Sequence, residues 1–361
     1  MAMKAYCKLS ESNLRHNLDV IRAKAPEANI MAIVKDDAYG HGLIQFSQKL
    51  DGLVEALGVA SIDEAMALRK IGIEAQIVLI DGVSTTEELY IASREEFIVV
   101  FDSSYQIQLL KQIKIPKLLK VWMKLDSGMG WRGFYPDKGA EQFLQFLSNH
   151  PSVIKPVGIM SHFACADTPD HALNRIQIST FRNFVQNCHG EKSICNSAAI
   201  IAFPKMHYDW VRPGIALYGG SPIAGRSAKS LNLLPVMTFL SKLIDIEKYE
   251  NGDNVGYQAC FTCPEDMPVG FAAVGYGNGY PRRQINGKVQ INGKHCPLIQ
   301  VGMNTIAIDL RPCTNAKIGD EITLWGQGLA IEEVARVSGR LTYELMTNLH
   351  NVSFEWDKDD P

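Results

Sequence analysis

The chain up to about residue 217 alternates between short apolar runs and segments whose apolar residues keep helical spacing. The runs are rich in Ile and Val and do not alternate cleanly with polar residues, which is typical of strands buried on both faces of a parallel sheet. We therefore predict eight strands. They cover residues 30–34, 55–60, 76–80, 97–101, 119–125, 157–161, 193–195 and 210–217.

Helical signals lie before and between these strands. Leu14, Leu18 and Ile21 keep the spacing of one helix face. Residues 61–64 and 84–87 both read as a Ser-x-x-Glu capping box, in which the serine oxygen and the glutamate carboxylate accept from orphan amides at a helix start. The pattern therefore predicts helices that alternate with the strands.

Eight strands with intervening helices predict an α/β fold, a (β/α)8 TIM-type barrel over residues 10–232. An open doubly wound sheet is the structural alternative. The number of strands favours the barrel, and the strands at residues 193–195 and 210–217 carry the weakest signal.

The pattern changes after residue 232. Short strand-like segments are now separated by Asn-Gly and Gly-Asp turns, and Asn286-Gly287 and Asn292-Gly293 are dipeptides typical of hairpins. We predict a second, mostly β domain over residues 233–361, which the N-terminal strand at residues 1–9 joins. Its strands cover residues 237–247, 269–274, 288–291, 297–310 and 321–325, and helical patterns follow at 331–337 and 343–349.

Composition excludes several classes of protein. Lys and Arg total 36 against 39 Asp and Glu, so no basic excess supports nucleic-acid binding. The hydrophobic share of 46% is too high for a disordered chain, yet no apolar run reaches the roughly 20 residues of a membrane helix. The N-terminus lacks the apolar stretch of a signal peptide, so we expect a cytoplasmic protein.

Cysteine usage indicates neither a disulfide scaffold nor a zinc site. The eight cysteines are spread over the whole chain, and Cys260 and Cys263 form the only Cys-x-x-Cys pair. A structural zinc site would need a second pair, and His295-Cys296 is a poor candidate. We expect free thiols and no bound metal.

Candidate chemistry follows the strand ends, because a parallel barrel carries its site at the carboxyl ends of its strands. Lys35 directly follows the first predicted strand. One interpretation is an amine of lowered pKa that forms an imine with a carbonyl compound. The other is a lysine that reaches the rim and pairs with Asp36 or Asp37. Position alone favours the second.

Residues near the seventh and eighth strands change this balance. Ser197 and the glycine-flanked amides around Gly214 resemble the place where barrels hold phosphate, and Tyr39 and Tyr343 offer hydroxyls. Each has an ordinary structural explanation: a cap, a turn or packing. Together with a buried lysine and a histidine whose ring can stack, they indicate a phosphorylated aromatic aldehyde, pyridoxal phosphate.

The motifs themselves resemble bacterial alanine racemase over about residues 4 to 354. The segment Ala-Ile-Val-Lys-Asp-Asp-Ala-Tyr-Gly-His-Gly at residues 32–42 is similar to the lysine signature of that family. Further matches follow in order along the chain. They are Lys124-Leu-Asp-Ser-Gly-Met, Ser161-His162-Phe, Val211-Arg212-Pro-Gly214-Ile215, Val255-Gly-Tyr257, Gly275-Tyr276-Gly-Asn-Gly-Tyr-Pro-Arg282, Met303 and Tyr343-Glu-Leu345.

The resemblance implies a homodimeric, pyridoxal-phosphate-dependent racemase that makes D-alanine for cell-wall peptidoglycan or consumes it. Lys35 would hold the cofactor and act as one acid/base group, and Tyr257 from the opposite subunit would be the other. Arg212 would face the pyridine nitrogen, with His162 beside the ring. The remaining implied residues are Tyr39, Ser197, Gly214, Ile215 and Tyr343 for the phosphate, Met303, Arg132 and Tyr276 for the substrate, and Lys124 as a carbamylated lysine.

The chain departs from the family pattern mainly around the substrate. Trp131 stands where the family has an arginine, and Arg132 comes one residue later. Gln300 stands where a substrate-channel arginine is common. The other departures are Asn304 and Asn278, each in place of an aspartate, and Asp36-Asp37 in place of Ala-Asn. The alternatives are a racemase of another small amino acid, such as serine, and a non-catalytic protein that binds pyridoxal phosphate.

Overall fold

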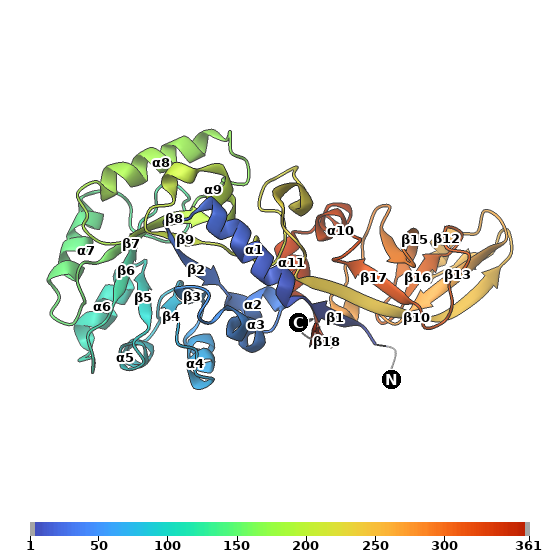
Figure 1. Ribbon diagram of the computed structural model, residues 1–361, viewed down its shortest axis with the longest axis horizontal. Coiled ribbons are helices and arrows are strands. Elements are labelled where there is room, and N and C mark those ends of the chain that lie inside the picture. Colours follow the sequence, from blue (N-terminus) through green and yellow to red (C-terminus); the bar gives the residue numbers. More distant parts are fainter. Residues whose placement is uncertain (1–3, 358–361) are drawn as a thin grey trace. The chain divides into compact units, whose positions relative to one another are not determined.

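The structure is a computed structural model that describes residues 4–357 and divides them into two compact units (Figure 1). Residues 18–217 and 222–226 form the barrel unit. Residues up to 17, 218–221 and from 227 onward form the β unit. The outer ends of the predicted β domain, at residues 1 and 361, lie outside the described residues.

The barrel unit contains a closed ring of eight parallel strands, each hydrogen-bonded to the next along the chain. The last strand pairs with the first, with Asn29 opposite Trp210, which confirms the barrel and excludes the open sheet. The strands are β2 (Asn29–Ile33), β3 (Ala56–Val59), β4 (Gln76–Leu79), β5 (Ile98–Phe101), β6 (Val121–Lys124), β7 (Gly158–Met160), β8 (Lys192–Asn196) and β9 (Trp210–Arg212).

Helices lie outside the ring of strands, as Figure 1 shows. Thus β3 and β5 are buried along their whole length, as their unbroken apolar sequence predicts. The helices are α2 (Lys35–Gly40), α3 (Leu43–Leu50), α4 (Ile62–Lys70), α5 (Thr86–Arg94), α6 (Ser104–Gln112), α7 (Lys138–Asn149), α8 (Ala172–Val185), α9 (Ser197–Ala202) and the short η1 (Pro204–Met206); α1 (Glu11–Lys24) contains the boundary at residue 17.

The capping signals are confirmed in part at one helix and displaced by one residue at another. At α4, the Glu64 amide donates to Ser61 Oγ, as predicted, but the Glu64 carboxylate accepts from the amide of Ala60 rather than from that of Ser61. At α5, the cap is Thr85 rather than Ser84, because the chain offers two overlapping frames and the helix starts at Thr86. The amide of Glu88 donates to Thr85 Oγ1, and the Glu88 carboxylate accepts from the amide of Ser84.

Two strands end earlier than their apolar runs. The strand predicted at residues 210–217 stops at Arg212, because Pro213 has no N–H to continue a ladder. The first barrel strand stops at Ile33, so Lys35 begins α2 rather than directly ending the strand.

The barrel interior is filled by side chains rather than being a pore. Trp122 and Trp210 meet edge to face with ring centroids 6.1 Å apart. Both belong to a buried cluster that draws on most of the strands: Met31, Ile33, Ala56, Val78, Ile98, Val100, Trp122, Met160 and Trp210.

The β unit is built on an eight-stranded sheet in the order β13-β16-β15-β14-β17-β10-β1-β18, in which β10 also pairs with β13. Its strands are β1 (Tyr6–Leu9), β10 (Met237–Tyr249), β13 (Met267–Ala272), β14 (Lys288–Ile291), β15 (Lys294–Val301), β16 (Ile306–Asp309), β17 (Glu321–Trp325) and β18 (Ser353–Trp356). The sequence pattern did not predict β18.

Turn chemistry decides the hairpins of this sheet. Asn292 and Gly293, both at positive φ, join β14 to β15 as predicted. Asn286 and Gly287 instead lie in a turn that leads into β14. The single strand predicted at residues 297–310 is two antiparallel strands, because the chain reverses at a turn in which the Gly302 amide donates to the Thr305 carbonyl.

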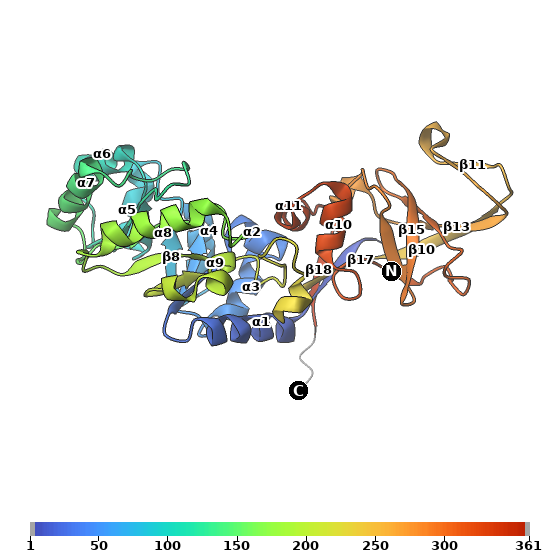
Figure 2. The same ribbon diagram turned by 90° about the horizontal axis from the view of Figure 1, so that it is seen from above.

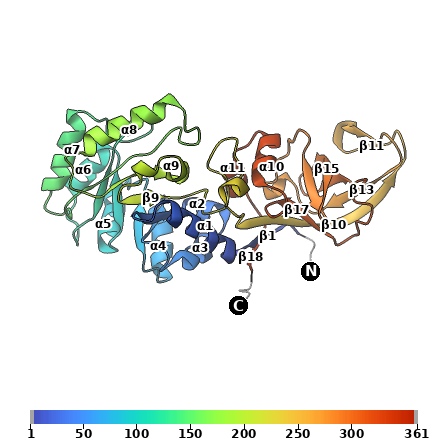
Figure 3. The ribbon, with the colours of Figure 1, turned by 45° about the horizontal axis from the view of Figure 1, so that its top comes forward.

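The β unit also contains a small second sheet, helices and short turns. A two-stranded sheet of β11 (Asn254–Val255) and β12 (Phe261–Thr262), also not predicted, encloses the turn η3 (Tyr257–Ala259) and lies at the end away from α10 (Figure 2). Figure 3 shows α10 (Ile331–Ser338) and α11 (Thr342–Thr347) side by side. Two further short turns are η2 (Ala228–Leu231) and η4 (Tyr276–Asn278). Among residues 4–357, no helix is long and apolar enough to cross a membrane.

Candidate active site

Lys35 opens a single left-handed helical turn at the rim of the barrel. Residues 36–39 have φ between 48° and 55° and ψ between 45° and 53°. For non-glycine residues this conformation costs about 1–2 kcal/mol each, so it persists only where its surroundings hold it. Here Asp37 accepts from the Leu43 amide through Oδ1 (2.7 Å) and donates its own amide to Glu64 (3.3 Å), while Ala38 is fully buried.

The amine of Lys35 lies 3.5 Å from Asp81 Oδ2, and 30% of the lysine side chain is exposed. The interpretation that paired this lysine with Asp36 or Asp37 is therefore wrong. The left-handed turn commits Asp37 to the start of α3, whereas Asp81 follows β4 and so reaches the same rim as Lys35.

Arg212, at the end of β9, is 3% exposed and held by three contacts. Its Nη1 donates to Ser193 Oγ (2.6 Å), and its Nη2 donates to the Ser161 carbonyl (2.5 Å) and to His162 Nδ1 (3.1 Å). Burial lowers the pKa of Arg212 to about 10. The guanidinium therefore stays charged at neutral pH and can only donate.

His162, just beyond β7, is neutral in this setting. Burial, with the charges of Arg212, Lys124 and Lys35, lowers its pKa to about 3. Because a guanidinium cannot accept, the Nδ1 that faces Arg212 is the unprotonated nitrogen and the proton lies on Nε2. The Asn196 amide nitrogen 3.2 Å from Nε2 then donates instead to the Phe163 carbonyl at 3.4 Å.

A small polar cradle lies between the ends of β8 and β9. Ser197 Oγ accepts from the Gly214 amide (2.8 Å) and the Ala216 amide (3.3 Å), which leaves its O–H as a donor. A Cβ on Gly214 would lie 2.8 Å from the Tyr39 hydroxyl, so only glycine lets that hydroxyl approach the cradle. Ile215 is buried beside it. Hydroxyls gathered around a glycine backbone fit a phosphate group.

Lys124, Asp102 and Arg132 form a charged cluster at the ends of β5 and β6. Arg132 Nη2 donates to Asp102 Oδ1 (2.9 Å), and its Nε lies 2.8 Å from Oδ2. Asp102 is only 4% exposed, and its carbonyl also accepts from the Gly133 amide. Burial lowers the pKa of Lys124, which the charges of Asp102 and Asp81 oppose. Trp131 is exposed.

The sequence-based prediction did not include Asp81, Asp102 and Ser193. Asp81 and Asp102 follow the apolar runs of β4 and β5 almost directly, so the rule that drew attention to Lys35 would also have found them. Ser193 lies inside β8, where no sequence signal separates a functional serine from a packing one.

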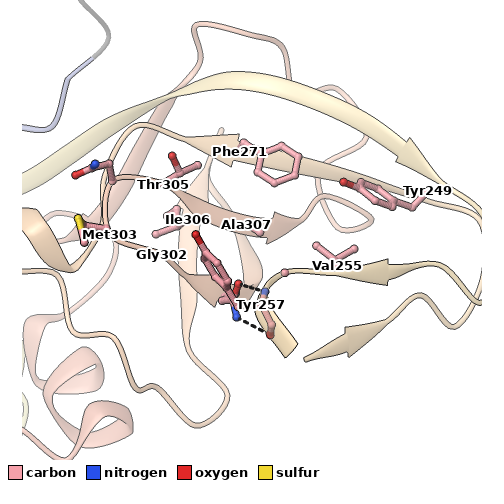
Figure 4. Close-up of a pocket in the computed structure, with 12 residues that line it drawn as sticks. Tyr249, Val255, Tyr257, Phe271, Gly302, Met303, Thr305, Ile306 and Ala307 are labelled. Carbon is pink, nitrogen blue, oxygen red and sulfur yellow. Dashed lines mark hydrogen bonds between the residues drawn. The ribbon is translucent and has the colours of Figure 1, made fainter. Parts of the chain in front are cut away.

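The other predicted site residues belong to the β unit. Tyr257 and Met303 line a pocket of about 600 Å³ together with Gln300 and Asn304 (Figure 4). The amides of Tyr276 and Gly277 donate to the carbonyls of Gly302 and Met303, which brings Tyr276 next to this pocket. Tyr343 lies on α11 and is partly exposed.

Comparison with known proteins matches both units. Residues 9–222 match the family model described as alanine racemase, N-terminal domain, and residues 236–354 match alanine racemase, C-terminal domain. The chain is 39% identical to an alanine racemase of Coxiella burnetii over 96% of both chains. It is 42% identical to that of Nitrosococcus oceani over 94% of this chain and 95% of the other.

The chain belongs to the alanine racemase family. Solved structures agree. The biosynthetic alanine racemase from Pseudomonas aeruginosa superimposes with a TM-score of 0.94 at 33% identity, covering 98% of this chain and 99% of that one. The alanine racemase from Acinetobacter baumannii gives 0.91 at 35% identity over the same shares. Membership in this family makes the protein an amino-acid racemase, an isomerase.

Proposed function

We propose that the protein interconverts L-alanine and D-alanine with pyridoxal phosphate as its cofactor. The observation that carries this proposal is the rim of the barrel, where the Lys35 amine, the Arg212–His162 pair and the Ser197–Gly214 cradle occur together. The amine could bond to an aldehyde, the fixed cation and the neutral ring could lie against a pyridine, and the hydroxyls could bind a phosphate. Family membership supports the same substrate.

The cradle residues would hold the phosphate. Ser197 can donate its O–H, Gly214 admits the Tyr39 hydroxyl, and Ile215 continues the turn. Tyr343 is the further hydroxyl that the resemblance assigns to this group. Because Arg212 keeps its proton, it would offer the ring nitrogen a donor without protonating it, which weakens the ring as an electron sink and limits side reactions. Bound pyridoxal phosphate would supply conjugation that stabilises a carbanion at the substrate α carbon.

Racemisation removes the α proton from one face of the substrate and returns one to the other face, and two proton-transfer groups on opposite faces suit this reaction. We assign one face to Lys35, whose Nζ has Asp81 within 3.5 Å as an anionic partner. We assign the other face to Tyr257 of a second subunit. The Tyr257 side chain is 78% exposed and Met303 is 56% exposed in the single chain, which fits a surface that a homodimer covers.

The substrate carboxylate would meet the Met303 turn. Within residues 4–357, the amide of Met303 donates to no carbonyl or side chain, so it is available to an anion. Tyr276 lies beside this turn through its hydrogen bond to Gly302. Arg132 is the remaining cation for the substrate side, and Asp102 fixes its position. Lys124 is the family's carbamylation position.

We further propose that the D-alanine formed enters peptidoglycan precursors in the cytoplasm. The support is the family resemblance and the similarity to a structure described as a biosynthetic alanine racemase.

The test is incubation of the purified holoenzyme with L-alanine in deuterated water, followed by chiral analysis. We expect D-alanine that carries deuterium at the α carbon. Racemised serine without racemised alanine would replace the proposal with the serine alternative. A yellow protein that borohydride bleaches, with neither amino acid racemised, would indicate a cofactor-binding protein without catalysis.

A second experiment tests the two faces separately. Tyr257→Phe removes the proton of one group, so the α proton of L-alanine should cease to exchange with solvent while that of D-alanine still does. Lys35→Arg is the matched variant and should lose exchange from D-alanine. Equal loss of exchange from both enantiomers in Tyr257→Phe would contradict the assignment of Tyr257 to one face.

A further inference from the structure

A single side chain, that of Gln300 on β15, makes hydrogen bonds to both backbone groups of Tyr257, its N–H and its C=O. Gln300 Oε1 accepts from the Tyr257 amide at 2.8 Å, and Gln300 Nε2 donates to the Tyr257 carbonyl at 3.3 Å. Figure 4 shows both hydrogen bonds as dashed lines beside Tyr257. The carboxamide thus makes the two backbone hydrogen bonds that a neighbouring strand would otherwise make to Tyr257.

The turn that Gln300 holds is strained. Gln258 and Ala259 have φ of 62° and 48°, a region that costs about 1–3 kcal/mol for a non-glycine residue. Gly256, at φ 84°, precedes them, and a Cβ there would lie 2.5 Å from Gln300 Oε1. Glycine at this position is therefore what allows the carboxamide to reach the Tyr257 amide.

Gln300 reaches the turn because the strand that carries it is irregular. The pairing of β15 with β16 shifts register between Leu298 and Gln300. Such a bulge re-aims the side chain that follows it. In this case it turns the carboxamide of Gln300 toward the backbone of the β11–β12 turn.

The phenol of Tyr257 has no hydrogen-bond partner within residues 4–357, so the backbone sets its direction. We propose that Gln300 is a positioning residue for Tyr257: it fixes the strained turn and thereby the point from which the phenol delivers and takes its proton. This inference rests on the proposed function, because it deepens the role assigned to Tyr257.

The chemistry of the side chain explains why glutamine fits. Only an uncharged carboxamide offers one acceptor to an N–H and one donor to a C=O at this spacing. An arginine, common here in the family, has donors only and could not accept from the Tyr257 amide. Glutamate would keep the acceptor and place a negative charge beside the Tyr257 carbonyl.

The test compares Gln300→Leu and Gln300→Glu with wild-type holoenzyme, with His295→Leu on the same strand as the matched control. The first readout is hydrogen exchange of the Tyr257 amide. We expect exchange to rise about tenfold or more in Gln300→Leu, because the acceptor is lost, and to stay within about threefold of wild type in Gln300→Glu, which keeps the acceptor.

The second readout is exchange of the α proton from each enantiomer. Gln300→Leu should slow exchange from L-alanine about tenfold and leave exchange from D-alanine within about twofold, because only the tyrosine face is displaced. In Gln300→Glu, the rate of exchange from L-alanine should lie between the rates of Gln300→Leu and wild type. If Gln300→Leu does not fold, the comparison of Gln300→Glu with wild type is the test. His295→Leu should resemble wild type in both readouts.

The outcomes separate this inference from the proposed function. Unchanged hydrogen exchange of the Tyr257 amide in Gln300→Leu would overturn the positioning role. An equal slowing of α-proton exchange from both enantiomers would overturn it as well. Faster amide exchange in a protein whose wild type does not racemise alanine would leave Gln300 as the support of the turn and overturn the proposed function instead.

Discussion

At the scale of single residues, burial controls the charges at the rim of the barrel. Arg212 stays a cation and His162 stays neutral, although the two side chains are only 3.1 Å apart. Lys35 and Arg132 are instead paired with Asp81 and Asp102. The rim therefore combines a fixed donor (Arg212), a neutral ring (His162) and two basic side chains with acidic partners (Lys35 and Arg132). The proposed reaction needs these kinds of group.

Asp102 leads to a prediction about Lys124. Asp102 already supplies the anion that holds Arg132, and a carbamate on Lys124 would add a third negative charge to those of Asp102 and Asp81. We expect no stoichiometric carbamate on Lys124. The measurement is ¹³C NMR of the holoenzyme equilibrated with ¹³C-bicarbonate, with Lys124→Arg as the control. A full-occupancy carbamate signal that disappears in Lys124→Arg would show that the prediction is wrong.

Two histidines of lowered pKa predict a dependence of stability on pH. Burial lowers the pKa of His41 to about 4 and that of His162 to about 3. An unfolded histidine titrates near about 6.5, so below that pH the unfolded chain binds more protons than the native one. The free energy of unfolding should therefore fall on acidification from about pH 6.5, by about 1.4 kcal/mol per pH unit for each histidine until its native pKa is reached.

The variant that checks this is His162→Asn, compared by urea unfolding at two pH values. From pH 7.5 to pH 5, the free energy of unfolding of His162→Asn should fall by about 2 kcal/mol less than that of wild type, because this variant lacks one histidine that takes up a proton on unfolding. His189→Asn changes an exposed histidine and should match wild type. Equal losses in all three proteins would argue against a neutral His162 in the native state.

At the scale of elements, the sequence pattern located the strands and the tertiary structure adjusted their ends. The eight barrel strands follow apolar runs because burial on both faces leaves little else for them to contain. The left-handed turn of α2 had no such signal. Its four residues are ordinary L-residues, and their conformation depends on contacts with α3 and α4.

Asp37 gives the prediction for this element. Its Oδ1 accepts from the Leu43 amide at the start of α3, so Asp37→Ala should lower the free energy of unfolding by about 1 kcal/mol. Asp37→Asn keeps an acceptor at the same place and is the matched control, with little expected change. Urea unfolding measures both. A loss in Asp37→Asn as large as in Asp37→Ala would mean that the charge, rather than the cap, is what stabilises the turn.

At the scale of the whole molecule, the proposed chemistry is divided between two units of the chain. Lys35 and the phosphate cradle belong to the barrel unit, and Tyr257 and Met303 belong to the β unit. If two subunits share each site, neither a Lys35 variant nor a Tyr257 variant is active alone, but one site of a mixed dimer carries no substitution.

Subunit complementation tests this arrangement. Lys35→Ala and Tyr257→Phe, refolded together in equal amounts, should recover about a quarter of wild-type racemisation, since half of the dimers are mixed and each has one intact site. Each variant refolded alone is the control. Absence of recovery from a mixture that forms dimers by sedimentation would contradict a shared site.

The sequence by itself determined what depends on local pattern. Apolar runs specified the barrel strands, Asn292-Gly293 specified its hairpin, and ordered motifs identified the family. These features can be predicted from the sequence because burial, turn geometry and motif chemistry each depend on a few neighbouring residues.

Only the tertiary structure decided which distant groups meet. Lys35 reaches Asp81 across 46 positions, Arg132 reaches Asp102 across 30, and Gln300 reaches Tyr257 across 43. No periodicity encodes these pairings. They follow from barrel closure, which gathers the strand ends on one rim, and from a bulge and a strained turn whose geometry is fixed by packing against other strands.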